Sequence, residues 1–273
     1  MSWWGKVLGG TFGFVLGGPL GAVLGAALGH SFDKGLTGIE NDGYLSPGAN
    51  QEQIQAAFFT ATFSLMGRIA KADGQVSQDE IDVATQTMAR MQLNPDQTQA
   101  AKKLFNEGKS ESFDYESVIS QLKSVCGRRT NLLRVFLEIQ ISTALADGEL
   151  HSNEQNILIS VSGLLGFDRR SFEKLLAMVV AQQRFANANG SAGQGARNSQ
   201  SVNQISQAYQ VLGVDTNCSD QELKRAYRKL ISQHHPDKLV SKGLPEEMMK
   251  IATEKTREIK EAYDLIKSIR DKK

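Results

Sequence analysis

The chain contains few cysteines, few prolines and no excess of either charge. Two of its 273 residues are cysteines, five are prolines, and 31 basic residues face 30 acidic ones. Two widely separated cysteines without a Cys-x-x-Cys partner indicate neither a disulfide framework nor a zinc ribbon. The charge balance argues against a nucleic-acid partner, so any basic surface must be local. Strand-type alternation is also scarce, and the helical patterning predicts an all-α protein.

Charge is absent altogether from the first apolar segment. Val7 to Gly29 is a run of 23 residues without one charged side chain. At about 1.5 Å per residue this run makes roughly 34 Å of helix, which is enough to cross a bilayer. We therefore predict a transmembrane anchor at 1–30 and a connector at 31–50. A cleavable signal peptide is the alternative, but its apolar core would be too long and only one lysine precedes it.

Glycine recurs at every fourth position of this segment. The row includes Gly9, Gly13, Gly17, Gly21 and Gly25. Small residues at this spacing let two transmembrane helices approach closely, so we predict that the anchor forms a homodimer. The alternative is that glycine is simply frequent in membrane spans.

An internal repeat follows the connector. RIAKADGQVSQDE (68–80) aligns with STALADGELHSNE (142–154), and each copy is typical of a helix, a tight Asp-Gly turn and a second helix. The aligned acidic residues are Asp73, Glu80, Asp147 and Glu154. Together they would offer oxygen ligands to a divalent metal, although the spacing does not fit a calcium-binding EF-hand loop. Helix capping and turn chemistry are the favoured interpretation, so we expect no cofactor.

The repeat resembles the TerB-like (tellurite resistance) helical domain, whose two halves carry such turns. The resemblance covers 51–185 and implies a helical bundle with a hint of acidic metal sites. The composition then changes to NANGSAGQGARNSQSVN, which has almost no apolar side chain to bury. We predict a flexible linker at 186–203 that leaves the following module, 204–273, free to move.

Two helices are predicted in the C-terminal module. Ser219 and Glu222 form a capping box that begins the first helix, and Pro236 ends it. One face of this helix is apolar, and the opposite face carries four cations that we call the basic strip: Lys224, Arg225, Arg228 and Lys229. A second helix begins near Pro245, and its apolar spacing predicts antiparallel packing on the first.

This module resembles the J-domain family. The resemblance rests on AYQVLGV (208–214), the basic helix, the tripeptide His235-Pro236-Asp237 and EAYDLI (261–266). It implies that His235, Pro236, Asp237 and the basic strip bind a DnaK-type chaperone and stimulate its ATPase.

The order of the modules resembles that of the membrane-anchored DnaJ-like co-chaperones. This resemblance implies a regulatory protein that is not an enzyme, with a link to envelope or capsule signalling. It also implies a single pass through the bacterial inner membrane, with the N-terminus outside and the C-terminal domains in the cytoplasm.

Two other functions fit the sequence less well. The first is a metal-binding stress-response protein centred on the TerB-like domain, with the J-domain as an accessory. The second is a hydrolase that uses His235 and Asp237, but no nucleophile elbow, phosphate loop or metal-ligand helix accompanies them. A metal-binding measurement on the TerB-like domain separates the first alternative from a co-chaperone.

Overall fold

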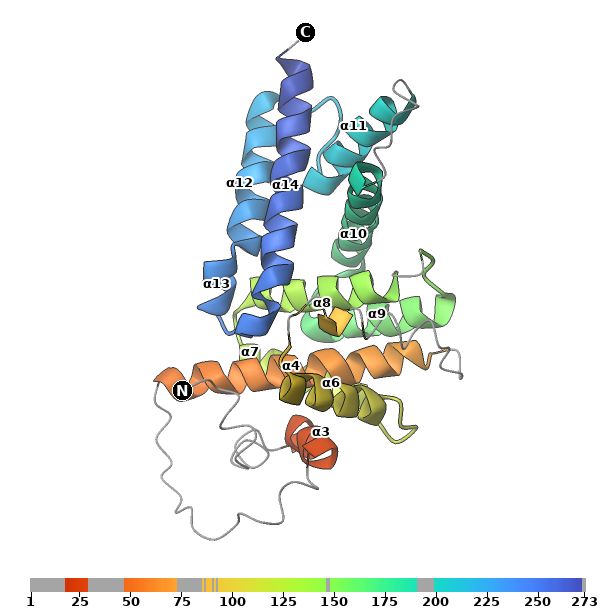
Figure 1. Ribbon diagram of the computed structural model, residues 1–273, viewed down its shortest axis with the longest axis vertical. Helices are drawn as coiled ribbons and strands as arrows, with labels where there is room; N and C mark the ends of the chain where they lie inside the picture. Colours follow the sequence, from red (N-terminus) through yellow and green to blue (C-terminus); the bar gives the residue numbers. More distant parts are fainter. Residues whose placement is uncertain are drawn as a thin grey trace.

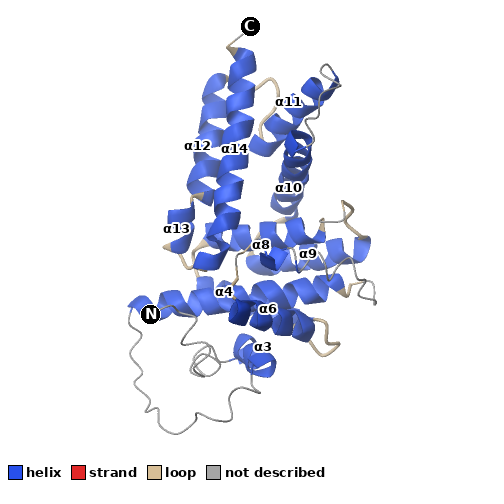
Figure 2. Ribbon diagram, in the orientation of Figure 1, coloured by secondary structure: helices blue, strands red, loops and turns tan. Residues whose placement is uncertain are grey.

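The computed structural model shows an all-α protein, as the sequence predicts. The residues it describes are 18–28, 47–72, 85, 87–89, 91, 93–145, 148–190 and 199–271. Across these residues the elements are helices, and none is a strand (Figure 1, Figure 2). The helices are α3 (Gly18–Leu28), α4 (Pro47–Ala70), α6 (Pro95–Gly108), α7 (Tyr115–Cys126), α8 (Thr130–Ala144), α9 (Ser152–Leu165), α10 (Arg169–Gly190), α11 (Ser199–Leu212), α12 (Asp220–His234), α13 (Pro236–Val240), the 3₁₀ turn η2 (Glu246–Met248) and α14 (Met249–Arg270).

Helix α4 is the centre of the TerB-like domain. Every residue from Ile54 to Gly67 is buried, as suits a helix that is predominantly apolar on all sides. Two hydroxyl groups in this stretch bond to the helix itself: Thr62 Oγ1 donates to the Phe58 carbonyl at 2.7 Å, and Ser64 Oγ donates to the Thr60 carbonyl at 2.8 Å. Helices α6, α7 and α8 pack around α4. The aromatic ring of Phe58 meets that of Phe136 on α8 edge to face, with 5.6 Å between centroids.

Two glycines let α4 and α6 touch backbone to backbone. A Cβ atom on Gly67 would lie 2.0 Å from the carbonyl oxygen of Phe105, and one on Gly108 would lie 1.8 Å from that of Ser64. No side chain fits at either position, because heavy atoms cannot approach so closely. The two glycines therefore fix how closely α6 covers the central helix.

The second copy of the sequence repeat forms the predicted helix, turn and helix. Helix α8 ends at Ala144 and α9 begins at Ser152. Between them Gly148 has φ +96°, a left-handed value that favours glycine, and its N–H donates to the carbonyl of Leu145 at 2.9 Å. In the first copy α4 ends at Ala70, and the turn lies outside the described residues.

Helix α3 is the described part of the predicted anchor. It lies against α6 and α7, where Leu20 and Leu24 are buried and the Leu20 N–H donates to Gln121 Oε1 at 2.7 Å. Its 11 residues make roughly 16 Å of helix. Among the helices that the structure describes, none combines the length and the apolar character needed to cross a bilayer. Of the predicted dimer glycines, α3 contains Gly21 and Gly25, whereas the others fall outside the described residues: Gly9, Gly13 and Gly17.

Helices extend into both ends of the predicted linker. Helix α10 continues to Gly190 and α11 begins at Ser199, with 191–198 outside the described residues. Helix α11 packs against α10, and the C-terminal module lies directly on the TerB-like domain (Figure 1). This differs from the freely moving module that the sequence predicts. The polar composition of a connecting segment describes that segment only, and says nothing of whether the flanking modules share an interface.

Arg270 joins three elements of the C-terminal module. Its guanidinium donates to the hydroxyl of Tyr209 at 2.9 Å, to Asp220 Oδ1 at 2.6 Å and to the carbonyl of Cys218 at 2.8 Å. The bonds to Asp220 and Tyr209 raise the pKa of Arg270 above its ordinary value. The end of α14 is thereby tied to α11 and to the start of α12.

Candidate functional site

The His-Pro-Asp turn, residues 235–237, forms a corner between α12 and α13. Helix α12 begins at the predicted capping box, in which the Ser219 N–H donates to Glu222 Oε2 at 2.8 Å and Ser219 Oγ accepts from the Glu222 N–H at 3.3 Å. It ends at His234 because Pro236 disfavours helical geometry at the residue before it, and His235 has φ −59° and ψ 122°. Pro236 then takes the first position of α13, where its missing N–H has no cost.

The side chains of the turn are open to a partner. The Asp237 side chain is 87% exposed and that of His235 is 44% exposed, and His235 Nδ1 lies 3.9 Å from Asp237 Oδ2. Among the described residues, His235 Nδ1 has no hydrogen-bond partner although that atom is shielded from solvent. The Asp237 carboxylate therefore remains available to a donor or cation on another protein.

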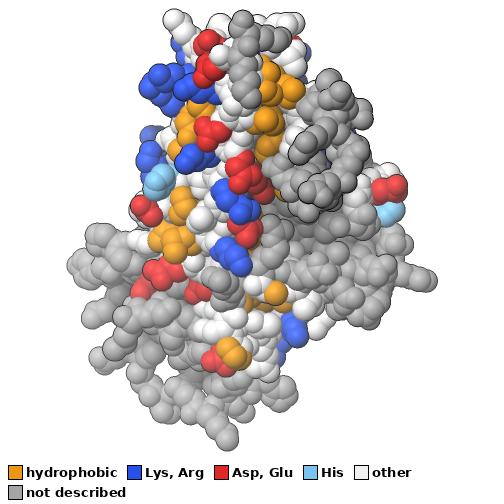
Figure 3. All heavy atoms as spheres, turned by 45° about the horizontal axis from the view of Figure 1, so that its top comes forward, with side chains coloured by type: hydrophobic (Ala, Val, Ile, Leu, Met, Phe, Trp, Pro, Cys, Tyr) orange, Lys and Arg blue, Asp and Glu red, His pale blue; other side chains and the backbone are white. Residues whose placement is uncertain are grey.

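The basic strip lies on the exposed face of α12. Its four side chains are exposed, whereas Leu223, Leu230 and His234 on the other face are buried. Figure 3 shows Lys and Arg side chains gathered along this edge, with His and acidic side chains beside them. The strip and the turn thus face solvent on the same edge, in the arrangement that would meet a single partner.

Helix α14 supports α12 from behind, and the two helices run antiparallel as predicted (Figure 1). The rings of Tyr227 and Tyr263 stack with 4.2 Å between centroids and 20° between planes. Ile259, Ala262 and Ile266 of α14 are buried in the same contact region. The regularly spaced apolar residues of α14 therefore form the core of the helical hairpin.

Known protein families match all three predicted modules. A family model described as the co-chaperone DjlA transmembrane domain matches 1–39, tellurite resistance protein TerB matches 59–177, and the DnaJ domain matches 207–273. Curated relatives match the chain along almost its whole length. Co-chaperone protein DjlA of Photobacterium profundum is 44% identical over 270 residues, covering 97% of this chain and 98% of the relative. The DjlA proteins of Vibrio cholerae and Yersinia pestis are 45% and 42% identical, each over 98% of both chains.

The chain belongs to the DjlA family of co-chaperones. The predicted resemblance, its three modules and their order are confirmed. The match to the DjlA transmembrane domain over the glycine-rich segment makes this a membrane-anchored protein. The prediction of a co-chaperone is confirmed, and the matches do not favour the alternative of a metal-binding stress-response protein. No solved structure matches the chain.

The structure describes one of the four acidic residues of the repeat, Glu154. Glu154 lies at the start of α9, where its Oε2 accepts the N–H of His151 at 3.0 Å, which is the capping chemistry expected as the alternative to metal binding. The other three lie outside the described residues: Asp73, Glu80 and Asp147. Within the described ranges, no group of three or more His, Cys, Asp or Glu side chains is placed to hold a metal ion. The absence of a cofactor stays a prediction, with a metal at the complete set as its alternative.

Sequence reasoning missed a polar contact next to the turn. His234, the residue before the tripeptide, places Nε2 at 2.9 Å and 3.1 Å from the two carboxylate oxygens of Glu138 on α8. Burial on its own raises the pKa of Glu138, but the His234 charge and hydrogen bond, with Lys255 and Arg134 nearby, outweigh it and hold the pKa below its ordinary value. The available signal was one carboxylate within the otherwise uncharged run FLEIQISTALA (136–146).

Proposed function

We propose that this chain is a regulatory co-chaperone that stimulates ATP hydrolysis by a DnaK-type chaperone at the membrane. The observation that carries the proposal is an exposed His-Pro-Asp turn that continues directly from a helix with four exposed cations. The hydrolytic chemistry belongs to the chaperone. This chain acts as a binding partner and not as an enzyme.

The basic strip and the turn have separate tasks. An acidic surface on the chaperone would be attracted by the strip, which sets the rate of encounter and the orientation of the complex. Pro236 holds the corner, while the imidazole of His235 and the carboxylate of Asp237 bond to groups on the chaperone. Because the strip is exposed to solvent, added salt weakens this attraction.

We place the J-domain on the cytoplasmic side of the bacterial inner membrane, because a DnaK-type chaperone and ATP are found there. The tail before the anchor then lies outside, and its one lysine, Lys6, is a small obstacle to translocation. Leu20 and Leu24, which are buried where α3 lies against α6 and α7, are equally suited to lipid, since lipid tails are as apolar as leucine.

Flotation of proteoliposomes tests this function. The full chain is reconstituted in phospholipid vesicles, mixed with a purified DnaK-type chaperone and ATP, and centrifuged through a density gradient. The chaperone is expected to float with vesicles that carry the chain and to stay at the bottom with empty vesicles. A chaperone that stays at the bottom in both samples would contradict the proposal.

We also propose that the anchor pairs two copies of the chain through its glycine row. Pairing would place two J-domains side by side and raise the local concentration of chaperone-binding sites. Replacing Gly13, Gly17 and Gly21 together by leucine should keep the segment in the membrane while blocking close helix approach. Disulfide trapping between anchors, with membrane fractionation alongside, measures both effects.

A matched control for the glycine variant changes three positions off the row, Val15, Ala22 and Val23, to leucine. We expect this control to pair as the wild type does, and the glycine variant to lose most of its cross-linked dimer. Equal pairing in the two triple variants would show that the glycines are not the interface.

A further inference from the structure

The segment that follows the His-Pro-Asp turn is bound to the TerB-like domain by hydrogen bonds to its backbone. Gln51 Nε2 donates to the carbonyl of Val240 at 3.2 Å, and Gln55 Nε2 donates to that of Leu244 at 3.4 Å. Both donors are on α4. The Leu244 carbonyl, which lies outside the helices, is thus bonded by the central helix of the other domain. The Val240 carbonyl also accepts the Gly243 N–H at 2.9 Å, and Gln51 adds a second donor to it.

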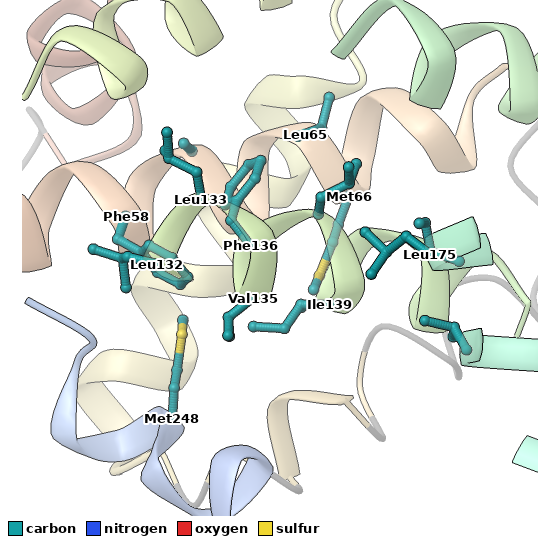
Figure 4. Packing of buried hydrophobic residues seen from close by; sticks show 14 of the residues in the cluster. Phe58, Leu65, Met66, Leu132, Leu133, Val135, Phe136, Ile139, Leu175 and Met248 are labelled. Carbon is teal, nitrogen blue, oxygen red and sulfur yellow. The ribbon is translucent and has the colours of Figure 1, made fainter. Parts of the chain in front are cut away.

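Side-chain packing seals the same contact. Gly243 has φ +105°, and a Cβ atom there would lie 2.4 Å from Ile54 Cγ2 on α4, so the loop rests directly on that helix. Met248 is fully buried, and Figure 4 shows it pointing toward Phe58 and Leu132 of the TerB-like domain. The J-domain therefore contributes a side chain to the core of its neighbour, which is typical of a fixed interface.

Glu138 and His234 form a buried polar pair in this interface, each with 1% of its side chain exposed. His234 Nδ1 lies 2.9 Å from the carbonyl of Leu230, which only accepts, so Nδ1 carries a proton. The other ring nitrogen then shares a second proton with the Glu138 carboxylate, whichever atom holds it. Removing either side chain leaves the other buried without this partner, which is unfavourable in a site closed to water.

The pair acts at the point from which the turn departs. His234 is the last residue of α12 and is bonded covalently to His235, so fixing its ring fixes the direction in which the tripeptide leaves the helix. The interface covers the segment after the turn but leaves the Asp237 side chain 87% exposed. The contact therefore presents the turn to solvent and does not hide it.

We propose that Glu138 is a positioning residue for the J-domain: through His234 it holds the His-Pro-Asp turn in the orientation that the chaperone meets. This inference rests on the proposed function, because it concerns the stimulation of the chaperone. It gives the TerB-like domain a part in that stimulation, since a change that moves α8 moves the turn.

The test uses variants of the full chain in detergent micelles. For each variant it measures the concentration of the chain at which stimulation of the chaperone's ATPase is half-maximal. Glu138→Ala removes the partner of His234 and is expected to raise that concentration about tenfold, because fewer molecules hold the competent orientation. Glu138→Gln is expected to stay within about twofold of the wild type, because its amide donates to the neutral His234 ring while Nδ1 keeps its proton. Glu173→Ala makes the same change at an exposed carboxylate of α10 and is expected to change nothing.

A second variant disturbs the interface without touching the pair. Gln51→Ala with Gln55→Ala removes the two bonds from α4 and is expected to raise the half-maximal concentration about threefold, which keeps the inference testable if Glu138→Ala fails to fold. The backbone amide signals of His235 and Asp237 in nuclear magnetic resonance spectra should move in Glu138→Ala and not in Glu173→Ala.

Two failures are distinguishable. A wild-type chain that does not stimulate the chaperone overturns the proposed function. A wild-type chain that stimulates, together with a folded Glu138→Ala variant that stimulates equally or more strongly, overturns the positioning role alone.

Discussion

His235→Gln is expected to reduce ATP hydrolysis by the chaperone to its unstimulated rate while the variant stays folded. The imidazole is the group of the turn that faces both solvent and Asp237, so a partner loses its contact when the ring is replaced. Substitutions at exposed positions usually change the free energy of unfolding by less than about 0.5 kcal/mol. Steady-state ATP hydrolysis with the full chain in micelles measures the loss, and circular dichroism checks the fold.

A second histidine provides the control for this variant. His151 is exposed at the start of α9 in the TerB-like domain, and His151→Gln makes the same chemical change away from the turn. We expect His151→Gln to stimulate as the wild type does. Stimulation by His235→Gln at the wild-type level would remove the turn from the mechanism.

Reversing the charge of Arg225 and Arg228 to glutamate is expected to raise the half-maximal concentration of the chain by about 30-fold to 100-fold at low salt. Each exposed cation becomes an anion, so a surface that attracted an acidic partner now repels it. The response to salt should also reverse: wild-type stimulation weakens as salt is added, whereas the variant improves because salt screens the repulsion. Titrations of the chaperone's ATPase at two ionic strengths measure both effects.

The matched control makes the same change in net charge at another exposed place. Arg169 and Arg170 lie at the start of α10, and both side chains are exposed. Arg169→Glu with Arg170→Glu should leave stimulation and its salt dependence unchanged. If the two double variants behave alike, the effect is one of net charge and the basic strip has no specific role.

The site could be predicted from the sequence wherever its cause is local. The capping box of Ser219 and Glu222, the end of α12 before Pro236 and the antiparallel α14 all follow from rules that act over a few residues. The modules and their order were predictable for a similar reason, because each carries its own short motifs. The helix and turn of the second repeat copy, with Gly148 in a left-handed conformation, belong to the same class.

What the sequence could not predict depends on contacts between distant residues. Glu138 and His234 are 96 positions apart, and the residues next to each of them do not indicate that the two side chains meet. The close approach of Gly67 to Phe105 is similar, since a glycine within a helix is compatible with many neighbours. The linker composition predicted free movement because it reports local chain entropy, whereas the J-domain is held by burial of Met248 and by the interdomain hydrogen bonds.

Single-turnover ATP hydrolysis tests most directly whether the membrane-anchored chain drives the chaperone. A DnaK-type chaperone with ATP already bound is mixed with proteoliposomes that carry the full chain with its J-domain outward, and the conversion of ATP to ADP is followed in time. We expect a faster conversion than with empty vesicles, and no acceleration when the vesicles carry His235→Gln. Equal rates with wild-type and empty vesicles would contradict this expectation.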